Sequence, residues 1–201
     1  MPASALNTYF YDMKLNRYAK VFLLLFAGTI ILSSCHTRKA VMKGEAGEIV
    51  KPQASIAEKY AQIMEVDKRD IKNGRLYNFI ELWTGIPYKF GGIDKDGIDC
   101  SGLALLLEQQ VYGINIPRIT YQQAAVIKRK YENELKEGDL VFFDFDGKQF
   151  SHVGVYLQNG YIVHASSTKG VMVVKLHSPS MYKYFSRGGS VKDDTVSAQG
   201  N

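Results

Sequence analysis

The hydrophobic pattern of the chain changes once, near residue 130, and this change limits the folds that it can adopt. Before it, apolar residues recur at helical spacing over residues 56–66, 76–84, 100–113 and 120–130. After it come four short runs rich in β-branched and aromatic residues, which turn residues separate: "GDLVFFDF", "HVGVYL", "YIVHAS" and "VMVVKL". Helices followed by strands predict an α+β fold in which N-terminal helices pack on an antiparallel β-sheet.

Two histidines, His152 and His164, lie on neighbouring strands of this predicted sheet. Because side chains alternate between the two faces of a strand, the loop length decides whether the two rings share a face. A two-residue turn would put them on opposite faces. A three-residue loop over residues 158–160 pairs His164 with Gly154 and makes His152 its diagonal neighbour, about 7 to 8 Å away at Cα. On this interpretation the two rings meet.

The N-terminal segment has the features of a lipoprotein signal peptide. Basic residues precede an apolar run of 12 residues, 21–32, which is too short for a membrane-spanning helix of about 20 residues. The run ends in "LSSC", which resembles a bacterial lipobox, so Cys35 is the expected site of lipidation. The alternative is an ordinary secretory signal with an incidental cysteine. Because the basic cluster follows Met13, that methionine is a candidate for the true start.

The charge of the chain argues against a nucleic-acid partner. The sequence holds 25 basic and 20 acidic residues. Removal of residues 1–34 takes away three basic residues and one acidic residue, which leaves 22 against 19, a net charge of +3. This excess is mild, and no basic stripe is interleaved with aromatic residues, so we expect no binding to nucleic acid.

Cys100 is a thiol that has no intramolecular disulfide partner, because the chain's other cysteine, Cys35, is the expected lipidation site. A lone thiol in an exported protein is exposed to oxidants, so it is either buried and inert or retained because it reacts. An apolar stripe at helical spacing follows Cys100 and ends at Gly113, which places the thiol in the first turn of a helix. The unsatisfied N–H groups there favour the thiolate and lower the pKa of the thiol.

Of the four histidines, His152 and His164 are the candidates for a base. His36 directly follows the expected lipidation site, in a segment with little apolar periodicity, and His177 lies beyond the last predicted strand. We expect His152 to take the proton from Cys100 and His164 to orient His152. A catalytic zinc site on the same three residues is an alternative, but it lacks the C-x-x-C and H-x-x-x-H elements of common zinc sites. We therefore expect no metal and no other cofactor.

Six segments resemble, in order and spacing, the NlpC/p60 family of bacterial cell-wall peptidases: "GIPYKFGG", "GIDCSGL", "IPRITYQQ", "LKEGDLVFF", "SHVGVYLQNGYIVHASS" and "GVMVVKL". They cover about residues 83–176. Members of this family are papain-like cysteine hydrolases. The resemblance implies a triad at Cys100, His152 and His164 that cleaves amide bonds in peptidoglycan stem peptides, either γ-D-glutamyl-diaminopimelate bonds or cross-link bonds.

Three further residues match positions that line the substrate site of this family, namely Tyr88, Asp99 and Ser101. The resemblance implies that they bind substrate. Asp99 has two alternative roles: its carboxylate pairs with the free amine of a stem peptide, or it caps the helix that Cys100 opens.

The resemblance also predicts how the chain is organised. We expect a signal peptide at 1–34, a lipidated tether and linker at 35–70, the NlpC/p60 catalytic domain at 71–189 and a disordered tail at 190–201. The protein is expected to be a monomer in the bacterial cell envelope. Its lipid is expected to anchor it in the outer membrane, on the side that faces the periplasm. The alternatives are an N-acetylmuramoyl-L-alanine amidase, an acyltransferase and a catalytically inert wall-binding protein.

Overall fold

The structure is a computed structural model that describes residues 50–192. The expected signal peptide, Met13, the lipidation site Cys35, the first part of the tether and most of the C-terminal tail lie outside the described residues. None of the helices between residues 50 and 192 combines the length and the hydrophobicity needed to cross a lipid bilayer.

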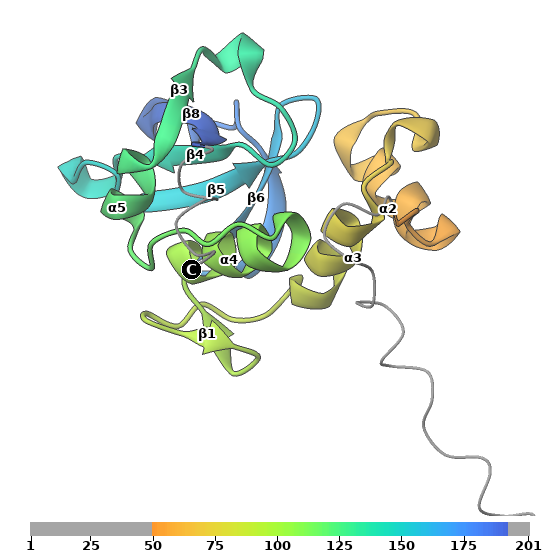
Figure 1. Ribbon diagram of the computed structural model, residues 1–201, viewed down its shortest axis with the longest axis horizontal. Helices are drawn as coiled ribbons and strands as arrows, with labels where there is room; N and C mark the ends of the chain where they lie inside the picture. Colours follow the sequence, from red (N-terminus) through yellow and green to blue (C-terminus); the bar gives the residue numbers. More distant parts are fainter. Residues whose placement is uncertain (1–49, 193–201) are drawn as a thin grey trace, which may run out of the picture. The chain divides into compact units, whose positions relative to one another are not determined.

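Helices form the first half of the described chain (Figure 1). The α-helices are α2 (Ala54–Met64), α3 (Gly74–Trp83), α4 (Cys100–Leu107) and α5 (Thr120–Ala125). α4 continues as a π-helical turn, Glu108–Tyr112, and ends at Gly113, whose φ of 72° is left-handed. The helices predicted over residues 56–66, 76–84 and 100–113 are therefore confirmed. Short 3-10 turns occur at Lys68–Asp70, Glu132–Glu134, Phe145–Gly147 and Tyr182–Tyr184.

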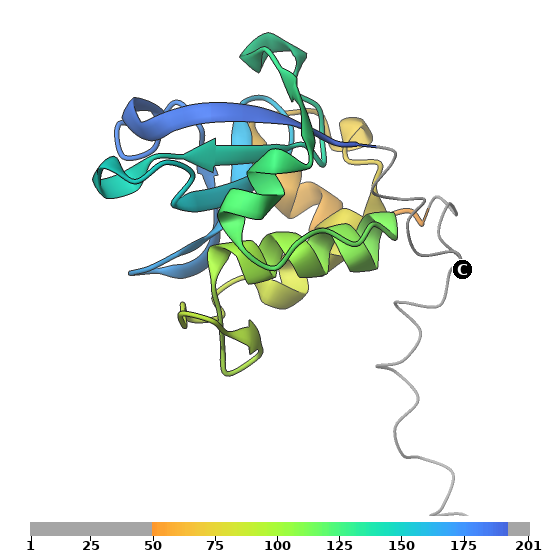
Figure 2. The same cartoon turned by 60° about the vertical axis from the view of Figure 1, so that its left-hand side comes forward.

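The second half forms a six-stranded antiparallel sheet in the order β3-β8-β4-β5-β6-β7. α4 runs along one face of this sheet (Figure 2). A small separate hairpin of β1 and β2 precedes α4. This arrangement confirms the predicted α+β fold. The strands are β1 (Ile93–Asp94), β2 (Gly97–Ile98), β3 (Ile127–Lys130), β4 (Leu140–Phe143), β5 (His152–Tyr156), β6 (Tyr161–Ser166), β7 (Gly170–Lys175) and β8 (Phe185–Val191).

The helix predicted over residues 120–130 is wrong in its second half. α5 ends at Ala125, and β3 follows and pairs with β8. Strand β8 was not predicted, because its sequence "FSRGGSV" contains two glycines, which usually indicate a turn. The structure shows why a glycine is needed there: a Cβ on Gly189 would lie 2.1 Å from the carbonyl oxygen of Lys128. β3 and β8 approach too closely for a side chain at that position.

The hairpin of β5 and β6 has the predicted three-residue loop. Val155 pairs with Val163, and the same register places Gly154 opposite His164. Gly160 in the loop has a left-handed φ of 72°. A Cβ on Gly154 would lie 3.4 Å from the Cβ of His164, so the glycine leaves room for the ring opposite. The hairpin therefore turns both histidines to one face.

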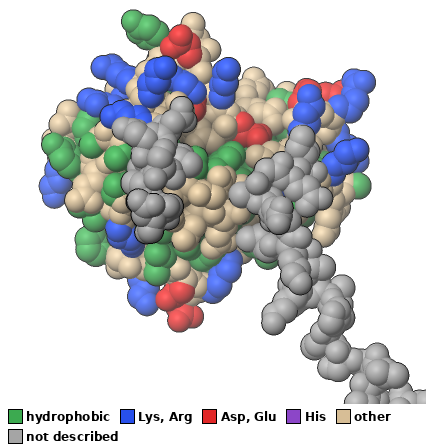
Figure 3. Space-filling view, viewed as in Figure 1, with side chains coloured by type: hydrophobic (Ala, Val, Ile, Leu, Met, Phe, Trp, Pro, Cys, Tyr) green, Lys and Arg blue, Asp and Glu red, His purple; other side chains and the backbone are tan. Residues whose placement is uncertain are grey.

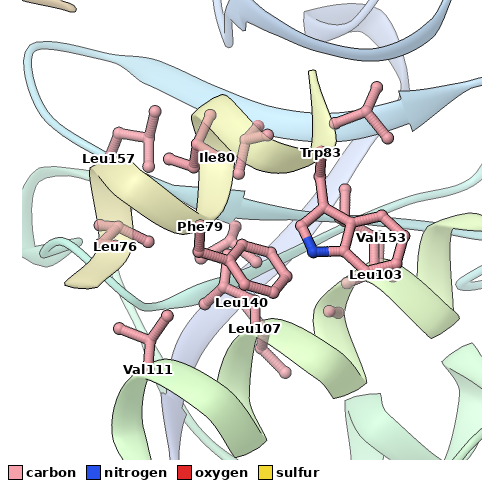
Figure 4. Close-up of a cluster of buried hydrophobic side chains, with 14 of the residues drawn as sticks. Leu76, Phe79, Ile80, Trp83, Leu103, Leu107, Val111, Leu140, Val153 and Leu157 are labelled. Atoms are coloured by element: carbon pink, nitrogen blue, oxygen red, sulfur yellow. The ribbon is translucent and has the colours of Figure 1, made fainter. Parts of the chain in front are cut away.

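An apolar layer joins α3 and α4 to the sheet (Figure 4). The rings of Phe79 and Trp83 lie 5.8 Å apart within this layer. Burying side chains of this size stabilises the fold by about 1.5–3 kcal/mol each. The layer therefore fixes the position of α4 against the sheet. Its labelled members are Leu76, Phe79, Ile80 and Trp83 from α3, Leu103, Leu107 and Val111 from α4 and the turn after it, and Leu140, Val153 and Leu157 from the sheet.

Helix α2 falls within the segment predicted as a linker, but it packs on the same core. Tyr60 and Met64 are fully buried, and the ring of Tyr60 lies 5.4 Å from the ring of Tyr77 in α3. The amide of Asn159 in the β5–β6 loop donates a hydrogen bond of 2.8 Å to the carbonyl of Met64. The predicted boundary at residue 70 therefore separates segments that share one core.

On the face shown in Figure 3, basic and acidic side chains are interspersed.

The turn between β6 and β7 is held against the segment that follows α3. The N–H of Gly85 donates to the carbonyl of Val171 at 2.8 Å, and the N–H of Val171 donates to the carbonyl of Ile86 at 2.9 Å. Gly170 has a φ of 73°, and a Cβ there would lie 2.4 Å from the carbonyl oxygen of Ile86. Only glycine permits this close approach of two backbones.

Gly170→Ala should destabilise the protein more than Gly160→Ala. Both positions have a left-handed φ, so each alanine costs about 1 kcal/mol of backbone strain. At Gly160 no other atom lies within 4 Å of the added Cβ, whereas at Gly170 the clash with Ile86 should raise the total loss to about 2–4 kcal/mol. Urea unfolding of the two variants measures the difference. Equal losses would contradict the close-approach argument.

Candidate active site

Cys100 is the first residue of α4, as predicted, and its thiol points at the sheet. The residue is 6% exposed. Its sulfur accepts a hydrogen bond from the backbone N–H of Val153 in β5 and lies 3.9 Å from the hydroxyl oxygen of Thr120 at the start of α5. Because Val153 directly follows His152, the packing of α4 on β5 brings the thiol next to a histidine.

The two predicted histidines meet on one face of the sheet. Nε2 of His152 lies 2.9 Å from Nδ1 of His164, and the two rings are nearly perpendicular, at 87°. Both residues are buried, and His152 also packs against the rings of Phe143 and Phe145. The predicted shared face is therefore confirmed. In the described part of the chain no three His, Cys, Asp or Glu residues are grouped so that they could hold a metal ion.

The thiol and the two imidazoles are neutral at pH 7, which differs from the expected thiolate. Burial raises the pKa of the Cys100 thiol, and the nearby Asp99 carboxylate raises it further. The hydrogen bonds that the sulfur receives act in the opposite direction but are outweighed. Burial lowers the pKa of His152 to about 3, with a further contribution from His164, and lowers that of His164 to about 4. The prediction of a lowered thiol pKa was wrong because it considered the helix terminus without the burial.

Asp99 is buried and forms the N-cap of α4. Its Oδ1 accepts hydrogen bonds from the backbone N–H of Gly102 at 2.6 Å and from Arg118 at 2.9 Å. Its Oδ2 accepts from the backbone N–H of Gly91 at 2.9 Å and from Arg118 at 2.9 Å. Although burial opposes it, these bonds keep the pKa of Asp99 below its ordinary value. Both oxygens are engaged, so the contacts observed are those of the helix-cap alternative.

The residues that hold the first turn of α4 from the other side were not predicted. Arg118 binds Asp99 and also donates a hydrogen bond of 2.9 Å to the hydroxyl of Ser101. The buried amide of Gln123 donates to the carbonyl of Ser101 at 3.0 Å and to that of Pro117 at 2.8 Å. Pro117, Arg118 and Gln123 all lie in the segment "IPRITYQQ". The only signal in this segment was one arginine between apolar residues. The sequence alone did not show that this arginine pairs with Asp99, so it did not indicate what the arginine does.

Ser101 and Tyr88 differ in their burial and in their access to solvent. Ser101 is buried, and its hydroxyl donates to Asp99 at 3.2 Å. Tyr88 is half-buried beside Cys100 and Asp99. Burial and the proximity of these two residues raise the pKa of its phenol. Tyr88 reaches the open pocket described next, whereas Asp99 and Ser101 are not among the residues that line it.

A pocket of about 650 Å³ opens beside the two histidines. We call it the histidine-side pocket. Tyr88 and Phe90 form one rim, and His152 and His164 are part of its wall. The side chain of Phe90 is 91% exposed, so the rim presents an aromatic ring to solvent. The other walls come from the β4–β5 connection, the β6–β7 turn, β7 and the segment after it. The pocket is large enough to hold a peptide fragment next to the histidines.

The sequence is similar to those of known proteins. The NlpC/P60 family model matches residues 85–189. The chain is 38% identical over 107 residues to the probable endopeptidase NlpC of Escherichia coli (strain K12), an alignment that covers 53% of this chain and 70% of that protein. It is 29% identical over 167 residues to the murein DD-endopeptidase MepS/murein LD-carboxypeptidase of the same strain, covering 82% of this chain and 88% of that protein.

Solved structures show the same fold. The NlpC/p60 domain of the peptidoglycan hydrolase SagA gives a TM-score of 0.50 at 27% identity, covering 58% of this chain and 97% of that one. An NlpC/P60 family protein from Bacillus cereus ATCC 10987 gives a TM-score of 0.54 at 24% identity, covering 72% of this chain and 42% of that one, and shows the α+β papain-like fold alone. The family match spans more than half of the sequence and contains both the cysteine helix and the histidine hairpin, and this chain therefore belongs to the NlpC/P60 family.

Proposed function

We propose that this protein is a peptidoglycan endopeptidase that hydrolyses amide bonds in murein stem peptides, with Cys100 as its nucleophile. The observation that carries the proposal is the contact between His152 and His164, on a hairpin whose Val153, next to His152, contacts the buried thiol through its backbone N–H. The names of the relatives support the substrate class, because MepS is a murein DD-endopeptidase and NlpC a probable endopeptidase. The target is a γ-D-glutamyl-diaminopimelate bond or a cross-link bond.

The hydrogen bond between the histidines determines where their protons lie. Nε2 of His152 is engaged with His164, so Nδ1 is the atom that serves the thiol. For Nδ1 to accept a proton, His152 must carry its own proton on Nε2 and donate it to Nδ1 of His164. His164 then holds its proton on Nε2. His164 is therefore a positioning residue, which fixes the tautomer and the orientation of the base.

In the first half-reaction, Nδ1 of His152 takes the thiol proton while the sulfur of Cys100 attacks the scissile carbonyl carbon. The carbonyl electron pair moves to oxygen, whose negative charge develops at the N-terminus of α4, where backbone N–H groups of the first turn point outward. When the C–N bond breaks, His152 gives its proton to the leaving nitrogen. The amine departs and a thioester remains on the sulfur.

In the second half-reaction, a water molecule gives a proton to Nδ1 of His152 and its oxygen attacks the thioester carbonyl. The C–S bond then breaks, the sulfur recovers its proton, and the acid product leaves. One water molecule is consumed, and one amide becomes one carboxylic acid and one amine. Because both side chains start neutral, His152 acts as a general base and not as one half of a preformed ion pair.

We further propose that the enzyme is a monomer held in the cell envelope by a lipid on Cys35. The lipid would anchor it in the outer membrane, on the side that faces the periplasm. The "LSSC" sequence supports the lipid anchor. Residues 1–34 would then be removed as a signal peptide. The predicted tail cannot begin at residue 190, because Ser190 and Val191 belong to β8 and pair with β3. Murein is the substrate named for the relative MepS, and an envelope location would place the enzyme next to it.

Digestion of purified muropeptides, with products identified by mass, tests the proposal. Cleavage within or between stem peptides is the expected result. Separation of the stem peptide from muramic acid would instead identify an amidase, and new amides formed with an added amine would identify an acyltransferase. Muropeptides that are bound but left intact would identify an inert wall-binding protein.

Activity should fall in a defined order when the three residues are replaced. Cys100→Ser should reduce kcat by at least about a thousandfold, and His152→Ala by about 10²–10⁴-fold, because nucleophile and base are both needed. His164→Ala should cost less, and His164→Asn should recover part of that loss, since it keeps an acceptor for Nε2 of His152. The exposed His177→Ala serves as the matched control and should retain full activity. Wild-type rates in the His152 variant would remove it as the base.

The thiol of the free enzyme should be protonated at pH 7, because burial raises its pKa above the ordinary value of 9.0. The ultraviolet difference spectrum between wild type and Cys100→Ala should therefore show no thiolate at pH 7, and the signal should develop only above pH 9. A thiol with a raised pKa keeps its proton to a higher pH, so its thiolate signal should appear at a higher pH than that of an ordinary cysteine. A thiolate signal that persists below pH 7 would contradict the neutral pair and indicate a thiolate–imidazolium pair.

Cys35→Ala should release the protein from the membrane fraction, because an N-terminal lipid is the strong anchor once a signal peptide is cleaved. Metabolic labelling with a fatty-acid analogue should mark the wild type and not the variant. Equal labelling of both proteins would rule out Cys35 as the lipidation site. Cys100→Ala is the matched control, and it should keep both the label and the membrane location.

A further inference from the structure

The histidine-side pocket lies where the amine part of a substrate must go. The carbonyl oxygen of the cleaved bond faces the N-terminus of α4, whereas the leaving nitrogen must reach His152 to receive its proton. The pocket is lined by His152 and His164, and neither Asp99 nor Ser101 at the start of α4 lines it. The group released as an amine therefore extends into this pocket, and the acyl group lies on the side of α4.

Two lysines, Lys148 and Lys169, give this pocket an excess of positive charge. One acidic residue, Asp146, lines it as well. Within residues 50–192, neither lysine has a carboxylate within ion-pair distance, and both side chains are exposed. Apart from His152 and His164, the remaining polar lining consists of hydroxyl groups, beside apolar residues such as Phe145 and Met172. Two lysines against one carboxylate leave the pocket with an excess of one positive charge, and neither lysine is in an ion pair within the described residues. This excess of positive charge, together with the hydroxyl groups, suits an anionic ligand.

The lysines come from two turns that are anchored independently. Lys148 follows the 3-10 turn after β4, and its backbone N–H donates to the carbonyl of Phe145 at 3.0 Å. The same loop is tied down by Asp144, which accepts from the N–H of Phe150 at 2.7 Å. Lys169 lies in the β6–β7 turn, where its N–H donates to the hydroxyl of Ser166 at 3.3 Å. The close packing of this turn against Ile86, described above, fixes it further. The two cations therefore rest on backbone that is already ordered.

We propose that the histidine-side pocket binds a free carboxylate carried by the leaving amine, and that Lys148 and Lys169 are the residues that recognise it. The inference rests on the proposed function and deepens it. A carboxylate is the anionic group that an amino-acid amine carries, and two ammonium groups with adjacent hydroxyls match its two oxygens. The acyl side of the bond contributes nothing to this selection.

The proposal restricts which murein bond is cleaved. In a cross-link, the amine that is released belongs to diaminopimelate, and the carbon that bears this amine also bears a free carboxylate. A terminal amino acid released from a stem peptide carries one as well. An amine whose carboxyl group is amidated lacks the charge. The enzyme should therefore prefer bonds in which the released amine stands next to an unmodified carboxylate.

A pair of cross-linked peptide dimers tests the selection. The dimers differ only in the diaminopimelate that is released, which carries a carboxylate in one and a carboxamide in the other. Wild-type enzyme should cleave the carboxylate form with kcat/KM about tenfold higher, the size expected of two partly exposed charge pairs. In K148M/K169M the carboxylate form should lose about this tenfold factor, and the carboxamide form should change by less than about twofold. High salt should reduce the wild-type preference and leave the variant unaffected.

Lys128→Met is the matched control, because Lys128 is an exposed lysine on β3, a strand that does not line the pocket. It should keep the wild-type preference. An unchanged preference in K148M/K169M would overturn the proposal, and so would an equal loss on both substrates, since that pattern indicates a general effect on the site.

Binding provides a readout that does not depend on turnover. The full chain with Cys100→Ala is titrated with meso-diaminopimelate and with its dicarboxamide, and chemical shifts are followed by NMR. Tighter binding of the carboxylate form, lost in the same chain with K148M/K169M, supports the pocket even where no dimer is cleaved. Failure of hydrolysis alone would then count against the proposed function, whereas equal binding of the two compounds would count against the carboxylate pocket.

Discussion

The position of the Cys100 thiol depends on one buried carboxylate. Asp99 accepts backbone hydrogen bonds from the loop that carries Gly91 and from the first turn of α4 at Gly102, and it receives both terminal nitrogens of Arg118. Three segments that are separated in the sequence therefore converge on one side chain. Removing Arg118 would leave the buried charge of Asp99 without its ionic partner, although the arginine itself is 34% exposed. Cys100 directly follows Asp99, so the contacts of Asp99 fix the position of the proposed nucleophile.

Burial is the second constraint, and it decides the protonation states of the site. His152 lies between aromatic rings and His164, and the thiol of Cys100 is enclosed between α4 and β5. An enclosure of this kind disfavours every charged form, so three titratable groups that are often written as ions stay neutral. In the proposed reaction, charge would appear only as bonds form and break, among groups that are already ordered.

Much of this arrangement could be predicted from the sequence, because local signals agreed with the final structure. The apolar stripe after Cys100 and the glycine at position 160 are local, and they gave the cysteine helix and the shared face of the two histidines. The failures had non-local causes. Residues 127–130 become a strand because β8, some sixty residues later, supplies their partner. Arg118 acquires its role only when the fold brings Asp99 to it, and the raised pKa of the thiol comes from burial that helix position alone does not indicate.

The place of β8 in the sheet has a consequence for the timing of folding. It is the last strand in the sequence, yet it lies between β3 and β4. A growing chain that has not reached residue 185 exposes one edge of β4 and leaves β3 unpaired with β8, so contacts distant in sequence must wait until synthesis is nearly complete. β4 in turn pairs with the strand that carries His152. The sheet that carries the two histidines is therefore complete only after the last strand of the sequence has been made.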